Sequence, residues 1–147
     1  MKSRQELEDN FDWWITCIPD KVNRLEELIP SEVFKRLDYS LESFDFLGKY
    51  ICDTIQSINN LKNEGELWDC YASYIGTTYR RNVPTAEWFV ELEDEKNVYY
   101  GVPALRTEAK TTFVPMYEIS AMLDRKRPDF LLALAKRHIE LQHHQAP

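Results

Sequence analysis

The sequence predicts an α+β fold in which a helical N-terminal half packs on a small antiparallel sheet and is followed by C-terminal helices. Apolar residues recur with helical spacing up to about residue 81, give way to short β-branched and aromatic runs, and return to helical spacing after Pro115. The chain has 147 residues, 44% of them hydrophobic, and contains no internal repeat or low-complexity linker. Residues 1–147 are therefore expected to form a single domain.

Two helices are expected in the first thirty residues. Ser3 is expected to cap the first, which Pro19 ends because a proline ring clashes with the preceding turn. Asp20 is expected to cap the second, which Pro30 ends. The inward-facing positions of this pair are Leu7, Phe11, Trp14, Ile15, Ile18, Val22, Leu25, Leu28 and Ile29.

The longest helix is predicted from about Ser40 to Lys62, with Gly65 as its terminator. A fourth helix is predicted from Glu66 to Arg81. Gly76 lies in its middle, where glycine costs about 1 kcal/mol relative to alanine. We therefore expect another element to pack closely against Gly76.

The pattern then predicts a β-hairpin, with strands at residues 88–92 and 98–102 joined by a turn at residues 93–97. A third strand is expected near Thr111 to Val114. Pro115 is expected to open a helix, and Pro128 to lie near the first turn of the last one.

Charge narrows the choice of partner. The net charge is −7, and residues 1–75 carry all of it, with 15 acidic and 8 basic residues, whereas residues 76–147 hold 10 of each. An acidic field repels nucleic acid and anionic membranes and accelerates encounters with basic proteins. No apolar run approaches the roughly 20 residues of a membrane span. A protein partner is therefore expected, and no nucleic acid or membrane.

Cysteine usage predicts the compartment. The three cysteines are odd in number and lie in apolar-periodic segments, which is typical of reduced, buried thiols. The N-terminal residues are charged and lack the apolar core of a signal peptide. The chain is therefore expected to be cytoplasmic.

No catalytic, cofactor or metal motif is recognised. The chain lacks a glycine-rich phosphate loop, and the spacing of His138, His143 and His144 does not suit a zinc site. A nucleophilic arrangement of Cys70, Asp69 and His138 can be drawn, although burial in a helix face would make the thiol inert. A small hydrolase or transferase built from these residues, or from carboxylates at the hairpin turn, is retained as the alternative function.

Six residues are candidates for contact with a partner. Trp13 and Trp14 are adjacent and about 100° apart around a helix, so only one of them can point inward. The other is expected at a rim or an interface, where Trp is enriched. The turn carries an acidic cluster that is either an ordinary solvated turn or a finger that contacts a basic partner. Its members are Glu91, Glu93, Asp94 and Glu95.

Two stretches carry a family resemblance. One is Leu37-Asp38-Tyr39-Ser40-Leu41-Glu42-Ser43-Phe44 before the long helix, and the other is Tyr71-Ala72-Ser73-Tyr74-Ile75-Gly76, followed by Arg80-Arg81 and Trp88. Together they resemble a group of small bacterial domains, several of which are similar to immunity proteins encoded near toxins. The resemblance covers about residues 34–120 and implies an α+β fold. It carries over no catalytic residue, and Thr77 stands where the group usually has glutamate after the glycine.

These observations favour a non-enzymatic protein-binding module, an immunity-like antidote that binds a basic bacterial toxin through an acidic surface. Electrostatic steering would bring the partners together, and a tryptophan anchor would then be buried. An obligate homodimer that buries the exposed tryptophan is a third hypothesis.

Overall fold

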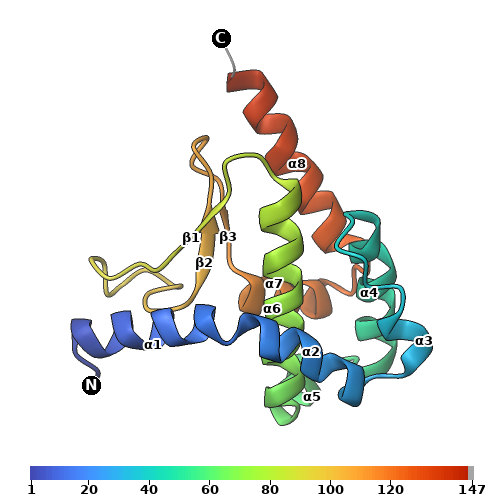
Figure 1. The fold of residues 1–147 in the computed structure, drawn as a ribbon. Coiled ribbons are helices and arrows are strands. Elements are labelled where there is room, and N and C mark those ends of the chain that lie inside the picture. Colours follow the sequence, from blue (N-terminus) through green and yellow to red (C-terminus); the bar gives the residue numbers. More distant parts are fainter. Residues whose placement is uncertain (146–147) are drawn as a thin grey trace.

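The computed structural model describes residues 1–145, which form eight α-helices and one three-stranded antiparallel sheet (Figure 1). The predicted α+β class is therefore confirmed. No helix within these residues is both long enough and apolar enough to cross a membrane. The helices are α1 (Arg4–Thr16), α2 (Ile18–Leu28), α3 (Ser31–Phe34), α4 (Glu42–Thr54), α5 (Ile58–Asn63), α6 (Gly65–Asn82), α7 (Pro115–Arg125) and α8 (Phe130–Gln145). The strands are β1 (Glu87–Phe89), β2 (Ala104–Arg106) and β3 (Thr112–Phe113).

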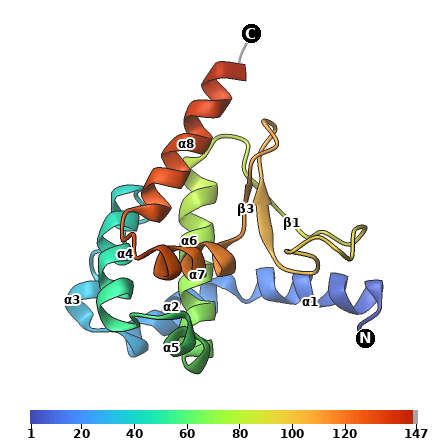
Figure 2. The same cartoon turned by 180° about the vertical axis from the view of Figure 1, so that it is seen from behind.

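Helix α6 runs through the middle of the molecule, with the sheet on one side and α4 and α8 on the other (Figures 1 and 2). Helices α2 and α7 pack against it. Its buried residues include Tyr71, Tyr74, Ile75 and Tyr79, so large aromatic side chains form the centre of the core. Burial of such side chains is the main stabilising contribution to a domain of this size.

Helix α1 is the outlying element of the fold. Its predicted N-cap is confirmed, because the Ser3 side chain accepts a hydrogen bond from the backbone N–H of Glu6. The predicted inward face is only half-buried, and α1 contains no fully buried residue. Figure 1 shows the helix extending from the base of the molecule under the loop that follows β1.

The expected boundary between the first two helices was wrong. Pro19 does not end α1 but lies in the first turn of α2. Proline is tolerated there because the first backbone N–H groups of a helix have no hydrogen-bond partner within it. Asp20 is likewise inside that first turn, as a favourable acidic residue near the helix dipole, and it is not the cap. Helix α2 ends at Leu28, and Pro30 caps the short helix α3.

The predicted helix from Ser40 to Lys62 is broken into α4 and α5. Gln56 adopts a left-handed backbone with φ 70°, and the Ser57 hydroxyl caps α5 by accepting a hydrogen bond from the N–H of Asn60. The Asn60 side chain in turn donates to the carbonyl of Ile55. Side-chain hydrogen bonds to the backbone thus replace one turn of helix. Gly65 is the first residue of α6 and not a terminator.

The sheet differs from the predicted hairpin. Strand β1 pairs with β2 at residues 104–106, and residues 98–102 form no strand. The competing interactions are local: Glu91, Asp94 and Asn97 side chains accept hydrogen bonds from backbone N–H groups two or three residues ahead. Gly101, with φ 72°, then turns the chain. The expected third strand is confirmed as β3, which pairs with β2.

Candidate functional site

A groove of about 500 Å³ lies between α1, α2 and the first half of α6. Most of its accessible lining is apolar, and charged side chains form its rim. We call it the Trp13 groove, and its lining residues are Asn10, Trp13, Trp14, Cys17, Asp20, Lys21, Arg24, Glu66, Asp69 and Cys70.

The two adjacent tryptophans point in different directions, as their helical spacing predicts. Trp13 is 69% exposed. Trp14 packs against the core, and its indole Nε1 donates a hydrogen bond of 2.7 Å to Asp69 on α6. Its ring also meets that of Trp88 edge-on, with centroids 5.4 Å apart. Trp14 therefore fixes α1 to the body of the protein, and Trp13 leaves its indole in solvent.

Lys21 and Asp69 connect the two walls of the groove. The Lys21 amine lies 3.5 Å from the Asp69 carboxylate and 3.7 Å from the centroid of the Trp14 ring. Burial lowers the pKa of Lys21, and the neighbouring Asp69 opposes that shift. On the rim, Arg24 forms ion pairs with Glu27 and Glu66.

The charge of the groove is thus largely balanced by internal pairs. Within residues 1–145, Asp20 is the carboxylate of the groove that forms no ion pair. Sequence reasoning did not single out Lys21 or Arg24. The sequence does contain a pattern that could have identified them. Trp14, Cys17, Lys21 and Arg24 follow one another at spacings of three, four and three residues, and such spacing places side chains on one side of the consecutive helices α1 and α2.

The predicted acidic cluster lies at the other end of α1. The Glu93 carboxylate forms an ion pair with Arg4, the first residue of that helix. Glu91 accepts backbone hydrogen bonds from Glu93 and Asp94, which lower the pKa of Glu91. Arg4 and Trp13 are nine residues apart, or roughly 14 Å along the helix axis. The structure therefore does not gather the six predicted partner-binding residues into one pocket.

Cys70, Asp69 and His138 do not form a catalytic arrangement. Cys70 is buried, and burial is the main cause that raises its pKa to about 11. His138 is hydrogen-bonded through Nδ1 to the hydroxyl of Tyr79, at 2.6 Å. Tyr79 and Cys70 are nine residues apart on α6, which places them on opposite faces of the helix. Across residues 1–145, no group of three or more His, Cys, Asp or Glu side chains could hold a metal ion.

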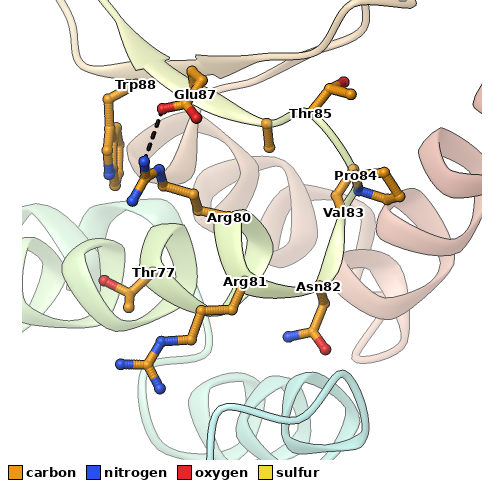
Figure 3. A pocket seen from close by; sticks show the side chains of 10 residues that line it. Thr77, Arg80, Arg81, Asn82, Val83, Pro84, Thr85, Glu87 and Trp88 are labelled. Carbon is orange, nitrogen blue, oxygen red and sulfur yellow. Dashed lines mark hydrogen bonds and ion pairs between the residues drawn. The ribbon is translucent and has the colours of Figure 1, made fainter.

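A second hollow, of about 520 Å³, lies where α6 leads into β1 (Figure 3). Two arginines line it, and Figure 3 shows that their guanidinium groups point to different sides. Arg80 forms a 2.8 Å ion pair with Glu87, whereas Arg81 lies over the Tyr39 ring, 3.9 Å from its centroid. Because the two cations diverge and each has an intramolecular partner, they do not form a joint anion site.

Comparison of this chain with protein-family models, with curated proteins and with solved structures finds no match. Its function therefore has to be inferred from its own residues and their geometry. Among the hollows described above, the Trp13 groove combines an apolar lining with a large exposed aromatic side chain, and it contains two of the six predicted contact residues.

Proposed function

We propose that this protein is a non-enzymatic protein-binding module whose Trp13 groove receives an apolar or aromatic side chain of its partner. The observation that carries the proposal is the Trp13 indole, 69% exposed beside an apolar-lined groove. Leaving a large apolar side chain in water costs free energy that burial in an interface recovers. Tryptophan is also among the residue types most enriched where interfaces concentrate their binding energy.

The partner is a basic protein. The net charge of −7 arises in residues 1–75, which contain the whole Trp13 groove. Asp20 at the rim remains open to an external cation. Asp94 and Glu95 add two exposed carboxylates in the loop whose Glu93 pairs with the start of α1. Negative charge at both ends of α1 steers a basic partner during encounter.

The biological role that fits these features is that of a cytoplasmic, immunity-like antidote that occludes a bacterial toxin. Its support is the resemblance of residues 34–120 to small bacterial domains of that kind, together with the charge and the exposed anchor. Occlusion needs an anchor and complementary charge, and it requires no reactive side chain.

The test uses the proteins encoded by the genes that flank this one. Each is purified and titrated against the chain by calorimetry at low and at high salt. We expect one basic protein to bind, with an affinity that falls as salt rises. Trp13→Ala should weaken that binding by about 30-fold, which corresponds to the roughly 2 kcal/mol of an interface hot spot.

Tyr117→Ala is the matched control, because Tyr117 is an exposed aromatic residue on α7, away from the groove. It should bind like the wild type. Equal affinity of Trp13→Ala and wild type would refute the role of the groove. A wild-type homodimer that Trp13→Ala dissociates in sedimentation would instead assign the groove to self-association.

A further inference from the structure

A separate pocket of about 450 Å³ lies beside the first half of α6. It is lined by the last residues of α2, α4 and α5 and is more polar than the Trp13 groove. Figures 1 and 2 both show α5 beside the start of α6, at the end of α6 remote from the C-terminus of α8. None of the predicted contact residues lines it.

One residue that lines this pocket carries a buried hydroxyl without a hydrogen-bond partner in the described part of the chain. Tyr71, one of its lining residues, is 0% exposed, and within residues 1–145 its hydroxyl has no hydrogen-bond partner. The other two buried tyrosines of α6 differ: Tyr74 is hydrogen-bonded to Ser43 and Tyr79 to His138. An unsatisfied buried hydroxyl destabilises the folded protein, and a bound polar group that pairs with it would remove that cost.

The pocket contains further hydrogen-bond acceptors and a carboxylate. Tyr50 and Glu64 also line the pocket, and both lie close enough to add to the effect of burial in raising the pKa of Tyr71. Asn60 donates its amide N–H to the carbonyl of Ile55, at 2.8 Å, which leaves its own carbonyl oxygen as an acceptor. Because its pKa is raised, the phenol of Tyr71 stays neutral and can both donate and accept hydrogen bonds.

The electrostatics of the pocket favour a cation. Glu64 provides a carboxylate, and among the described residues that line the pocket there is no Lys, Arg or His. Helices α2 and α4, of 11 and 13 residues, each present their C-terminal end to it, and α6 begins there, with Glu64 as its N-cap. The positive N-terminal end of α6 is thus offset by the Glu64 carboxylate, and the two C-terminal ends remain. The C-terminal end of a helix carries about half a negative charge, which stabilises a nearby cation and opposes an anion.

We propose that this pocket binds the guanidinium head group of an organic cation. Glu64 is the counter-charge, and the Asn60 carbonyl accepts an N–H hydrogen bond. The Tyr71 hydroxyl accepts another once the side chains that cover it shift on binding. The site is distinct from the Trp13 groove and does not depend on the function proposed for it. The same chemistry belongs to a small free guanidinium compound and to an Arg side chain of another protein.

Three probes distinguish these sources by calorimetry and by amide chemical-shift changes. They are butylguanidine, N-acetyl-arginine amide and the neutral isostere N-acetyl-citrulline amide. We expect at least one cation to bind with a dissociation constant at least 10-fold lower than that of the citrulline compound, and to shift amides of residues 54–71. Preference for butylguanidine indicates a small free cation, and preference for the capped arginine indicates a protein side chain.

Two variants test the assigned atoms. Glu64→Gln should weaken cation binding about 10-fold, and Tyr71→Phe several-fold. Tyr71→Phe removes only an unsatisfied hydroxyl, so it should fold with wild-type or higher thermal stability. Glu42→Gln, an exposed carboxylate at the opposite end of α4, is the control and should bind like the wild type. Failure of both cations to bind, or equal binding by wild type and both pocket variants, would overturn the proposal.

Discussion

At the scale of single residues, Gly76 shows how one position sets the distance between a helix and a strand. A Cβ atom placed on Gly76 would lie 2.3 Å from a ring carbon of Trp88 and 3.1 Å from Pro115. The indole of Trp88 therefore rests directly on the backbone of α6, and its ring also contacts that of Trp14 edge-on. The helix tolerates the lower propensity of glycine because this contact requires it.

Gly76→Ala should reduce the free energy of unfolding by about 1–3 kcal/mol, the usual cost of overpacking, even though alanine favours the helix. Gly65→Ala is the matched control, because nothing lies within 4 Å of a Cβ placed there. Urea denaturation of both variants measures the difference. Equal stability of the two would show that Trp88 can move aside at no cost.

The sequence predicted part of this arrangement. A glycine in mid-helix indicated close packing, and the angle between adjacent positions indicated that Trp13 and Trp14 diverge. It could not identify Trp88 as the packing partner, because that contact depends on how the chain reverses between α6 and β1. The role of Asp69 was likewise missed, since its partners Trp14 and Lys21 lie 55 and 48 residues away in the sequence.

At the scale of elements, α1 is held at two points. Near its start, Leu7 lies against Gly101 and Arg4 pairs with Glu93. Near its end, Trp14 is hydrogen-bonded to Asp69. The ion pair between Arg4 and Glu93 is exposed and contributes little to stability, as surface ion pairs usually do. The hydrogen bond between Trp14 and Asp69 fixes the position of the helix and thereby the orientation of Trp13.

Asp69→Ala should loosen α1 while leaving the core folded. It removes the acceptor of the Trp14 indole and the counter-charge of Lys21, at a cost of about 1–2 kcal/mol. We expect faster amide hydrogen exchange across residues 4–16 and little change in α6. Asp45→Ala, which removes an exposed pair with Lys49, is the control. Unchanged exchange in α1 would mean that Asp69 does not hold the helix.

Most helices with regular apolar spacing were predictable. The unbroken helix at residues 40–62 and the strand at residues 98–102 were wrong because side chains there hydrogen-bond to the backbone. Val98, Tyr99 and Tyr100 have high strand propensity, yet they lie in turns, where the Asn97 side chain accepts a hydrogen bond from the backbone N–H of Tyr99. Ser57 breaks the long helix by the same mechanism. Hydrogen bonds of this kind between side chains and the backbone depend on a few individual residues, and hydrophobic periodicity does not reveal them.

At the scale of the whole molecule, a buried polar contact joins α6 to the C-terminal helix α8. Tyr79 is hydrogen-bonded to His138, and its ring stacks on Phe113 of β3 with centroids 4.1 Å apart. Burial lowers the pKa of His138, and the nearby Arg137 adds to the effect. The folded protein therefore holds this imidazole neutral between two layers of the fold.

Stability should consequently fall as the pH drops below about 6.5, the ordinary pKa of histidine. In that range the unfolded chain binds a proton that folded His138 does not, so unfolding is favoured by up to about 1.4 kcal/mol per pH unit. Above that pH both states are neutral at this residue, and the effect vanishes. Thermal denaturation between about pH 7.5 and 5, which spans the ordinary pKa, measures it.

His138→Gln should flatten this dependence, because glutamine keeps a hydrogen-bonding side chain without a titrating group. His143→Gln is the control, since His143 is exposed near the end of α8 and should leave the wild-type slope intact. Buried Glu118, whose raised pKa stabilises the folded state on acidification, is present in all three proteins and cancels in the comparison. If wild type and His138→Gln lost stability in parallel, the acid sensitivity would have to arise from other groups, and the contact between α6 and α8 would be independent of pH.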